Sequence, residues 1–174
     1  ELVDAGFLGK KSGRGFFDYR NGADKPVPRS DPAQSPPAHI VLCGESAAAM
    51  ALAERLTAVG TAFELCDSVD GRIAQVGGAV VFVTDGRSAT QRAAQTTIAN
   101  TVLIDLALDY RIASRLAYTS AAQCSTSACN AATGLLQACG FKVSRLADVP
   151  GLAVMRTVAM LANEAADAVY QGVC

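Results

Sequence analysis

The sequence predicts an α/β fold, with a mostly parallel sheet flanked by helices. From residue 39 onward, short β-rich segments alternate with longer helix-like segments, as in βαβ units. Two of the β-rich segments, IVLC and AVVFV, are unbroken apolar runs, which is typical of strands covered on both faces. The hydrophobic residues, 51% of the chain, are mainly Ala, Val and Leu, as expected where helices pack closely on a sheet.

Six strands and four helices are expected in this alternating part. Gly60 and Gly140 follow two of the helix-like segments, at the place where a left-handed C-cap favours glycine. Asp148 and Pro150 indicate a turn before the last helix. We expect strands at 39–43, 62–66, 79–84, 101–105, 116–119 and 142–145, and helices at 47–59, 89–98, 127–138 and 151–172.

The chain divides into four predicted parts. Residues 1–19 form a Gly- and Lys-rich turn segment, and residues 20–38 carry five of the six prolines without apolar periodicity. Such a composition buries too little surface to fold, so 20–38 is expected to be an extended interdomain linker. Residues 39–148 form the α/β domain, and residues 149–174 are expected to form a separate final segment with one helix.

Charge and composition exclude several classes of function. The net charge of −1 leaves no basic footprint, so we expect no nucleic-acid partner. No apolar run approaches the length of a membrane span, and no secretory signal opens the sequence, so a cytoplasmic location is expected. The six cysteines include no CxxC pair and the chain has one His, so no metal site is expected; Cys43 and Cys66 lie in apolar runs and suit a core.

The first strand–helix unit, HIVLCGESAAAMALAERL, lies where a dinucleotide-binding loop would stand. Gly44 fills the first glycine place of G-x-G-x-x-G, whereas Ser46 and Ala49 occupy the second and third. Ser46 puts a side chain where a pyrophosphate would approach, although its hydroxyl and the helix N-terminus still suit an anion. This loop predicts a Rossmann-like domain with a degraded phosphate site.

Asp67 completes the candidate cofactor site. It follows the second expected strand, 23 residues after Gly44, where an acid would bind a ribose. The alternative is an Asp that starts a turn at the end of a strand, since SVDG follows. Gly44, Ser46 and Asp67 are therefore either a nucleotide site or the remnant of one in an inherited scaffold.

Two segments carry a family resemblance. ELVDAGFLGKKSGRGFFDY resembles the closing segment of the C-terminal domain of 3-hydroxyacyl-CoA dehydrogenases, and DVPGLAVMRTVAMLANEAADAVYQGVC resembles the segment that opens the same domain. The residues in step are Gly6, Gly9, Lys11, Gly13, Gly15, Phe16 and Tyr19 in the first segment, and Asp148, Pro150, Gly151, Arg156, Asn163, Glu164, Ala165 and Gly172 in the second.

The order of these segments resembles the long bacterial 3-hydroxybutyryl-CoA or 3-hydroxyadipyl-CoA dehydrogenases. These enzymes carry two copies of the C-terminal domain with a reduced Rossmann-fold domain between them. The family's catalytic Rossmann domain has a long helical insertion between its second and third strands, whereas only residues 68–78 separate those strands here. The resemblance implies a fragment of an enzyme that uses NAD to oxidise 3-hydroxyacyl-CoA in fatty-acid or aromatic-acid β-oxidation.

The same resemblance implies that this chain has no catalytic residue. In the family a His takes the proton of the 3-hydroxyl while a Glu orients it. Aligning the family's His segment with RIASRLAYTS puts Leu116 at the His position, with Thr119 and Ser120 in place of Asn-Pro. DLAL, residues 105–108, replaces a substrate-binding Asn-Thr-Ser-Ser segment, and Met155 replaces an Asn. The one His, His39, opens the first strand and cannot substitute.

Two functions follow as hypotheses. In the first, the chain is a non-catalytic scaffold or dimerisation module; NAD and the acyl-CoA substrate bind elsewhere in the parent enzyme, and this chain binds no cofactor. The last helix has an apolar face that would form a homodimer or dock to the catalytic copy. This apolar face comprises Leu152, Met155, Val158, Leu161, Ala165 and Val169. In the second hypothesis, the Rossmann-like domain is a regulatory module that binds a nucleotide or an acyl-CoA.

Overall fold

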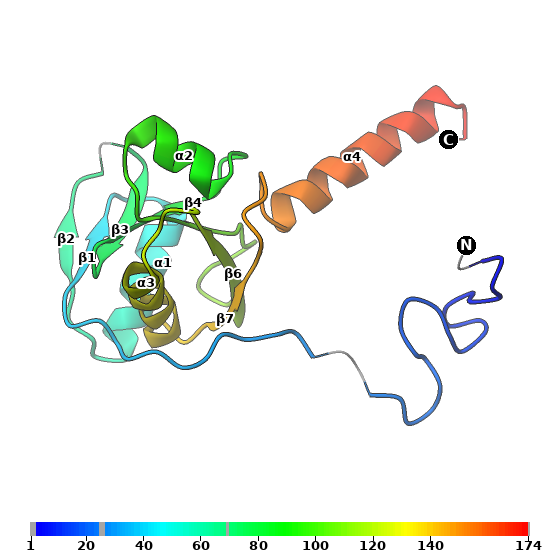
Figure 1. The fold of residues 1–174 in the computed structure, drawn as a ribbon, viewed down its shortest axis with the longest axis horizontal. Helices are drawn as coiled ribbons and strands as arrows, with labels where there is room; N and C mark the ends of the chain where they lie inside the picture. Colours follow the sequence, from blue (N-terminus) through cyan, green and yellow to red (C-terminus); the bar gives the residue numbers. More distant parts are fainter. Residues whose placement is uncertain (1–2, 25–26, 69, 174) are drawn as a thin grey trace.

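A seven-stranded sheet forms the centre of the molecule (Figure 1). The computed structural model describes residues 3–24, 27–68 and 70–173. The strand order is β2-β1-β3-β4-β5-β6-β7, with strands β1 (Ile40–Cys43), β2 (Glu64–Cys66), β3 (Arg72–Val76), β4 (Ala79–Val83), β5 (Thr101–Ile104), β6 (Arg115–Ser120) and β7 (Lys142–Arg145). The helices are α1 (Ala47–Ala58), α2 (Ala89–Thr96), α3 (Thr126–Ala138) and α4 (Val154–Tyr170). The Rossmann-like α/β class is confirmed.

The sheet is mixed rather than mostly parallel. Pairs β1–β2, β4–β5 and β6–β7 are parallel, whereas β1–β3, β3–β4 and β5–β6 are antiparallel. A parallel connection needs a crossover of a dozen or more residues, usually a helix. The β5–β6 connection contains no helix and is shorter than that, so β6 returns antiparallel. The expectation of a mostly parallel sheet was wrong on this point.

Strand β3 is an element that the sequence prediction left out. Residues 68–78 were expected only to connect two strands, but Arg72–Val76 forms a hairpin with β4. Gly77 and Gly78 have φ of 51° and 81°, as a two-residue hairpin turn of type I′ requires at both positions. The Gly-Gly pair between apolar segments was therefore the available signal for this hairpin.

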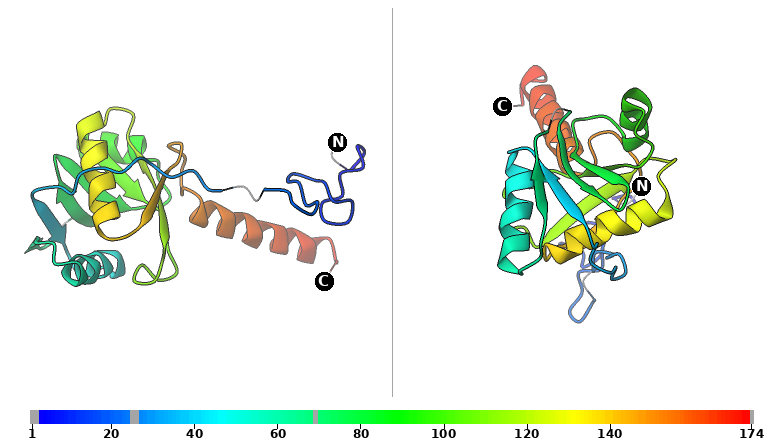
Figure 2. Two further views of the ribbon diagram at one scale, coloured as in Figure 1. Left: turned by 90° about the horizontal axis from the view of Figure 1, so that it is seen from below. Right: turned by 90° about the vertical axis from the view of Figure 1, so that its left-hand side faces the viewer.

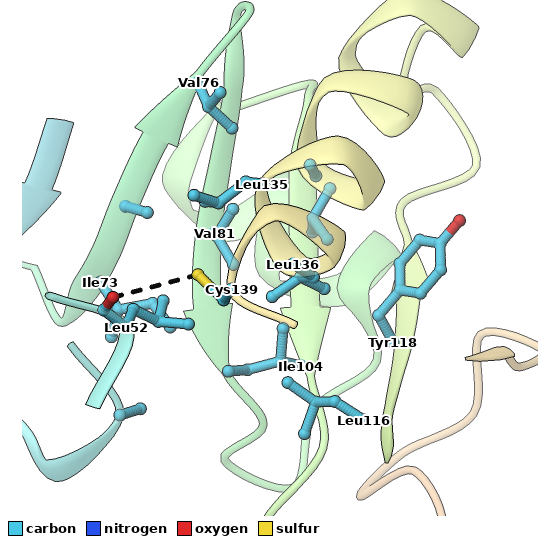
Figure 3. Packing of buried hydrophobic residues seen from close by; sticks show 14 of the residues in the cluster. Leu52, Ile73, Val76, Val81, Ile104, Leu116, Tyr118, Leu135, Leu136 and Cys139 are labelled. Atoms are coloured by element: carbon cyan, nitrogen blue, oxygen red, sulfur yellow. Dashed lines mark hydrogen bonds between the residues drawn. The ribbon is translucent and has the colours of Figure 1, made fainter. Parts of the chain in front are cut away.

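Helices cover both faces of the sheet. On one face α1 and α3 share a cluster with the strands, to which Leu52, Leu135 and Leu136 contribute fully buried side chains (Figure 3). On the other face α2 packs on Phe82 and Leu103 in a smaller cluster. Apolar side chains of β4 and β5 are consequently buried in both directions, which explains their continuous apolar sequences.

The Pro-rich segment is extended, as expected, but it is fastened to the domain. The main chain of Asp31 donates to the carbonyl of Val143 at 2.8 Å, and the Ser144 hydroxyl donates to the carbonyl of Arg29 at 2.6 Å. The Asp31 carboxylate accepts a 2.6 Å hydrogen bond from the Tyr118 hydroxyl. Burial, and to a smaller extent this hydrogen bond, raises the pKa of Tyr118 to about 12. Figure 2 shows the segment crossing α3.

Glycine in α3 makes room for this passage. A Cβ on Gly134 would lie 2.5 Å from the carbonyl oxygen of Ser35. On the same helix, Gln137 accepts a hydrogen bond from the Gln34 main chain at 2.8 Å and donates to the Pro32 carbonyl at 3.0 Å. We call residues 29–37 the strap, because they bind β7 and α3 across their outer surface.

Helix α4 leaves the domain and has no buried residue (Figure 1). Leu152, just before it, is buried beside α2 with a φ of +48°. Several apolar side chains of α4 are exposed, among them Val158, Met160, Leu161 and Val169. Among the described residues, no helix is both long and apolar enough to cross a membrane.

Candidate nucleotide site

Gly44 and Asp67 meet at the carboxyl edge of the sheet. They directly follow the parallel neighbours β1 and β2, whose last residues, Cys43 and Cys66, are register partners. A surface cavity of about 350 Å³ lies between them, lined by Gly44, Glu45, Leu65, Cys66 and Asp67. This is the place where open α/β sheets bind ligands, so two of the three expected site residues are brought together.

Gly44 serves a contact within the chain. Its φ of +74° requires glycine, and its amide donates to the Cys66 carbonyl at 2.9 Å. A Cβ at this position would lie 2.8 Å from the Cβ of Ser68. The space that the first glycine of a dinucleotide loop opens is thus taken by a side chain of the protein.

Ser46 is the N-cap of α1. Its hydroxyl accepts a hydrogen bond from the main-chain N–H of Ala49 at 3.3 Å. The side chain thus partners one of the N–H groups at the start of the helix, where a dinucleotide would place its phosphate. Ser46 does not line the cavity with Gly44 and Asp67. The helix-capping use of this residue accounts for its presence without a ligand.

The residues at this edge do not fit NAD. Glu45 and Asp67 are both exposed at the cavity, and two carboxylates repel a pyrophosphate. Ser68 occupies the space beside Gly44, and Ser46 caps the helix. The Ser46 and Ser68 side chains thus stand beside the loop backbone, Ser46 takes one N–H of the helix N-terminus, and the lining is acidic, whereas a dinucleotide needs close backbone approach and a helix N-terminus open to phosphate.

The segment that carries Ser68 is held by charged groups. The Ser68 hydroxyl donates to the Arg72 carbonyl at 2.8 Å, and Arg72 pairs with Asp70 at 2.5 Å. The hydrogen bonds from Arg72 lower the pKa of Asp70. Arg92 of α2 donates to the Asp70 carbonyl at 3.0 Å and lies 3.9 Å above the Phe82 ring. The side chain beside Gly44 consequently belongs to a fastened loop.

Arg92 is itself a buried cation. It pairs with Asp85 at 2.6 Å, and its Nε has no hydrogen-bond partner. Burial lowers the pKa of Arg92, whereas the hydrogen bonds that Arg87 makes lower the pKa of Asp85. Arg92 and Asp85 thus connect α2 to the loop that follows β4.

The positions that the family resemblance assigns to catalysis have structural contacts. Leu116 is buried in the core on β6. Thr119 donates to the Leu146 carbonyl at 3.2 Å, and Ser120 accepts from Arg145 at 2.8 Å. Met155 lies at the base of α4, close to Gly86: a Cβ added to Gly86 would lie 3.6 Å from the Met155 sulfur. None of these four side chains titrates near neutral pH.

Two aspartates have a role that sequence reasoning missed. The buried Asp105 carboxylate accepts the N–H groups of Ala153 and Val154 at 3.1–3.3 Å and so caps α4. Asp148 accepts the N–H groups of Ala89 and Thr90, at 2.6 and 2.9 Å, at the start of α2. The available signal for Asp105 was an acidic residue at the end of an apolar strand, TVLID. In the described residues, no group of three or more His, Cys, Asp or Glu side chains is placed to hold a metal ion.

Comparisons with known proteins agree with the arrangement of the elements. Residues 81–150 match the family model described as the 3-hydroxybutyryl-CoA dehydrogenase reduced Rossmann-fold domain. The chain is 30% identical, over 176 aligned residues, to 3-hydroxyadipyl-CoA dehydrogenase of Escherichia coli (strain K12), a match that covers 99% of this chain and 30% of that protein.

A solved structure shows the same similarity. The crystal structure of 3-hydroxybutyryl-CoA dehydrogenase from Escherichia coli K12 superposes with a TM-score of 0.66 at 29% sequence identity, covering 99% of this chain and 30% of that one. The chain therefore spans about 30% of the length of each of these relatives.

Proposed function

Because this chain belongs to the 3-hydroxyacyl-CoA dehydrogenase family, we propose that it is a non-catalytic scaffold region of a longer, NAD-dependent enzyme. That enzyme would oxidise 3-hydroxyacyl-CoA to 3-oxoacyl-CoA in fatty-acid or aromatic-acid β-oxidation, in the cytoplasm. NAD and the acyl-CoA would bind to another part of it. The 30% coverage of both relatives supports a role as one region of a larger protein.

One observation carries this proposal. Ser68 fills the space beside Gly44, and the loop that bears Ser68 is fastened through Arg72, Asp70 and Arg92. A ligand that approached Gly44 closely on this side would meet the Ser68 side chain. We also propose the division into 1–19, 20–38, 39–148 and 149–174, which rests on the Pro-rich composition of 20–38 and on the two segments that resemble the end and the start of a C-terminal domain.

A second candidate is a regulatory module that binds a nucleotide or an acyl-CoA. It is favoured by the 350 Å³ cavity that joins Gly44 to Asp67. An adenosine that placed its ribose on Asp67 without using the phosphate loop would be compatible with that lining.

A thermal-shift titration of the chain with NAD, NADH and acetoacetyl-CoA tests both candidates. A ligand present at 100 times its dissociation constant stabilises a protein by about 2.7 kcal/mol, so binding would be evident. The scaffold function predicts no shift with any of the three compounds. The matched variant Asp67→Asn identifies the site if a shift occurs, because loss of a ribose contact would reduce it. Turnover of 3-hydroxybutyryl-CoA by the isolated chain would contradict the scaffold function.

A further inference from the structure

Two thiols lie together beneath the candidate site. Cys43 and Cys66 end the neighbouring strands β1 and β2, and their Sγ atoms are 2.6 Å apart. Both are free thiols in this structure. Gln75 of β3 approaches the Cys43 sulfur at 3.7 Å from the other side. Nothing in the scaffold function uses this pair.

The strand register places the two residues within bonding reach. Cys43 and Cys66 are directly opposite in a parallel pair. Neighbouring strands lie about 4.7–4.9 Å apart. Disulfides span Cα separations of about 4.4–6.8 Å with an S–S bond of about 2.05 Å. The backbone can therefore remain in place while the sulfurs close the short remaining distance.

Access to the two sulfurs is unequal. Cys66 is half-buried and lines the 350 Å³ cavity, whereas Cys43 is 1% exposed. A small oxidant entering from solvent thus reaches Cys66 first. Cys43 then lies behind it as the second thiol.

We propose that Cys43 and Cys66 are a modification site. A low-molecular-weight disulfide such as oxidised glutathione oxidises the two thiols, which become joined by an intramolecular disulfide. The Cys66 thiolate attacks one sulfur of oxidised glutathione and releases one glutathione thiolate, which takes up the proton that Cys66 lost. The Cys43 thiolate then attacks Cys66 Sγ in the mixed disulfide and releases the second glutathione thiolate, which takes up the proton that Cys43 lost. Two protein thiols are oxidised and one glutathione disulfide is reduced to two thiols.

The surroundings of Cys66 make the first step dependent on pH. The hydrogen bond to Cys43, with burial, raises the pKa of Cys66 to about 11; Asp67 acts in the same direction, and Arg72 opposes it. The thiolate is the nucleophile, so the oxidation rate rises with pH across the neutral and alkaline range. The pair is accordingly stable as thiols until an oxidant accumulates.

The bond would fasten the edge of the sheet. Strand β2 has three residues and pairs only with β1 in the described structure. A disulfide joins it to β1 at the carboxyl edge and closes the chain segment that contains α1. Closure of a loop of this length stabilises a protein chiefly by restricting its unfolded state.

Peptide mapping tests the proposal on the unmodified chain. After oxidation by oxidised glutathione, alkylation and trypsin digestion, Cys43 lies in peptide 30–55, Cys66 in 56–72, and the three cysteines at 124, 129 and 139 in 116–142. The expected product is a linked pair of peptides 30–55 and 56–72, with a higher unfolding temperature that dithiothreitol reverses. Recovery of both peptides as unlinked, alkylated thiols would overturn the proposal.

Two variants test the order of attack. In Cys43→Ser, Cys66 should retain one glutathione as a stable adduct, whereas in Cys66→Ser the buried Cys43 should stay unmodified. Equal modification of the remaining thiol in both variants would contradict the assigned order. Oxidation of the wild-type chain in urea is the control for folding, since links to peptide 116–142 should then appear as well. The same scrambled links under native conditions would overturn the proposal.

Discussion

Single residues at the carboxyl edge of the sheet now serve the protein's own loops. Gly44 provides the positive φ and the absent side chain that a phosphate loop needs, but Ser68 takes the space. Ser46 caps α1, and Asp105 caps α4. Groups that suit a ligand by type are thus used for internal hydrogen bonds and packing.

Replacing Gly44 with Ala should destabilise the fold by more than the backbone strain alone. The left-handed conformation costs a non-glycine residue about 1–2 kcal/mol, and the new Cβ would also meet Ser68 at 2.8 Å. Gly60→Ala is the matched control, because Gly60 has a φ of +70° and nothing within 4 Å of its Cβ position. Urea unfolding should show a larger loss for Gly44→Ala, and equal losses would contradict the contact with Ser68.

The candidate site was partly predictable from sequence. The strand–helix pattern around Gly44 and the 23-residue spacing to Asp67 place both residues at one edge, and the structure brings them together. The position of Ser68 was not predictable, because it depends on the path of a loop held by Arg92 from a distant helix. The family resemblance places Asp105 only in a segment that replaces a substrate-binding one, and its capping role was not predictable because its partners lie 48 and 49 residues away.

Elements were predictable where local signals determine them. Ser125 begins α3 as an N-cap and Ser88 begins α2 with a capping box, so the helix starts agree closely with expectation. The mixed sheet was missed because the Gly77-Gly78 turn and the short β5–β6 connection, both of which favour antiparallel pairing, were not recognised. The strap was expected only to be extended, since its hydrogen-bond partners are supplied by α3 and β7.

The variant Gly134→Ala should release the strap without weakening α3. Ala favours a helix over Gly by about 1 kcal/mol, but the new Cβ would lie 2.5 Å from the Ser35 carbonyl oxygen. Loss of one net hydrogen bond, worth about 1 kcal/mol, would raise the released fraction about fivefold. Trypsin cleavage after Arg29, whose carbonyl accepts from Ser144, should accelerate accordingly. Cleavage after the exposed Arg20 is the internal control, and an unchanged ratio of the two rates would contradict the prediction.

The variant Asp105→Asn should loosen the start of α4. The substitution removes the charge that faces the helix N-terminus and one of two acceptor oxygens, at a cost of about 1 kcal/mol. Amide hydrogen exchange should become faster at Ala153 and Val154. Asp167→Asn, near the other end of the same helix, should leave those amides unchanged.

At the scale of the whole molecule, charged groups tie the loops to α2. The pKa values of Asp70 and Asp85 are lowered in the folded state, chiefly by hydrogen bonds from Arg72 and Arg87. A lowered pKa contributes stability that is present above the unfolded value, near 3.9, and is lost as pH falls through the folded value. The free energy of unfolding should therefore drop below about pH 4, and Asp85→Asn should make that drop smaller. An unchanged acid profile for Asp85→Asn, measured by urea unfolding, would contradict this linkage.

The exposed side of α4 should produce concentration-dependent association of the whole chain. Val158 and Leu161 lie one helical turn apart and are 59% and 64% exposed. Burial of a Leu side chain contributes about 1.5–3 kcal/mol, so Leu161→Lys should weaken association tenfold or more. Met160→Lys is the matched control, since Met160 is 62% exposed but lies on another face of the helix. Sedimentation velocity would measure both, and a monomer at all concentrations would argue against a dimer through this face.

The Asp105 cap also gives α4 the mechanics of a lever. A helix of 17 residues is about 25 Å long, so a rotation of about 10° at its base displaces its far end by about 4 Å. The base is fixed by the two hydrogen bonds to Asp105 and by the buried Leu152. Small adjustments at the end of β5 are thereby amplified for whatever packs on α4. A buried carboxylate at the end of β5 thus becomes the pivot about which α4 turns.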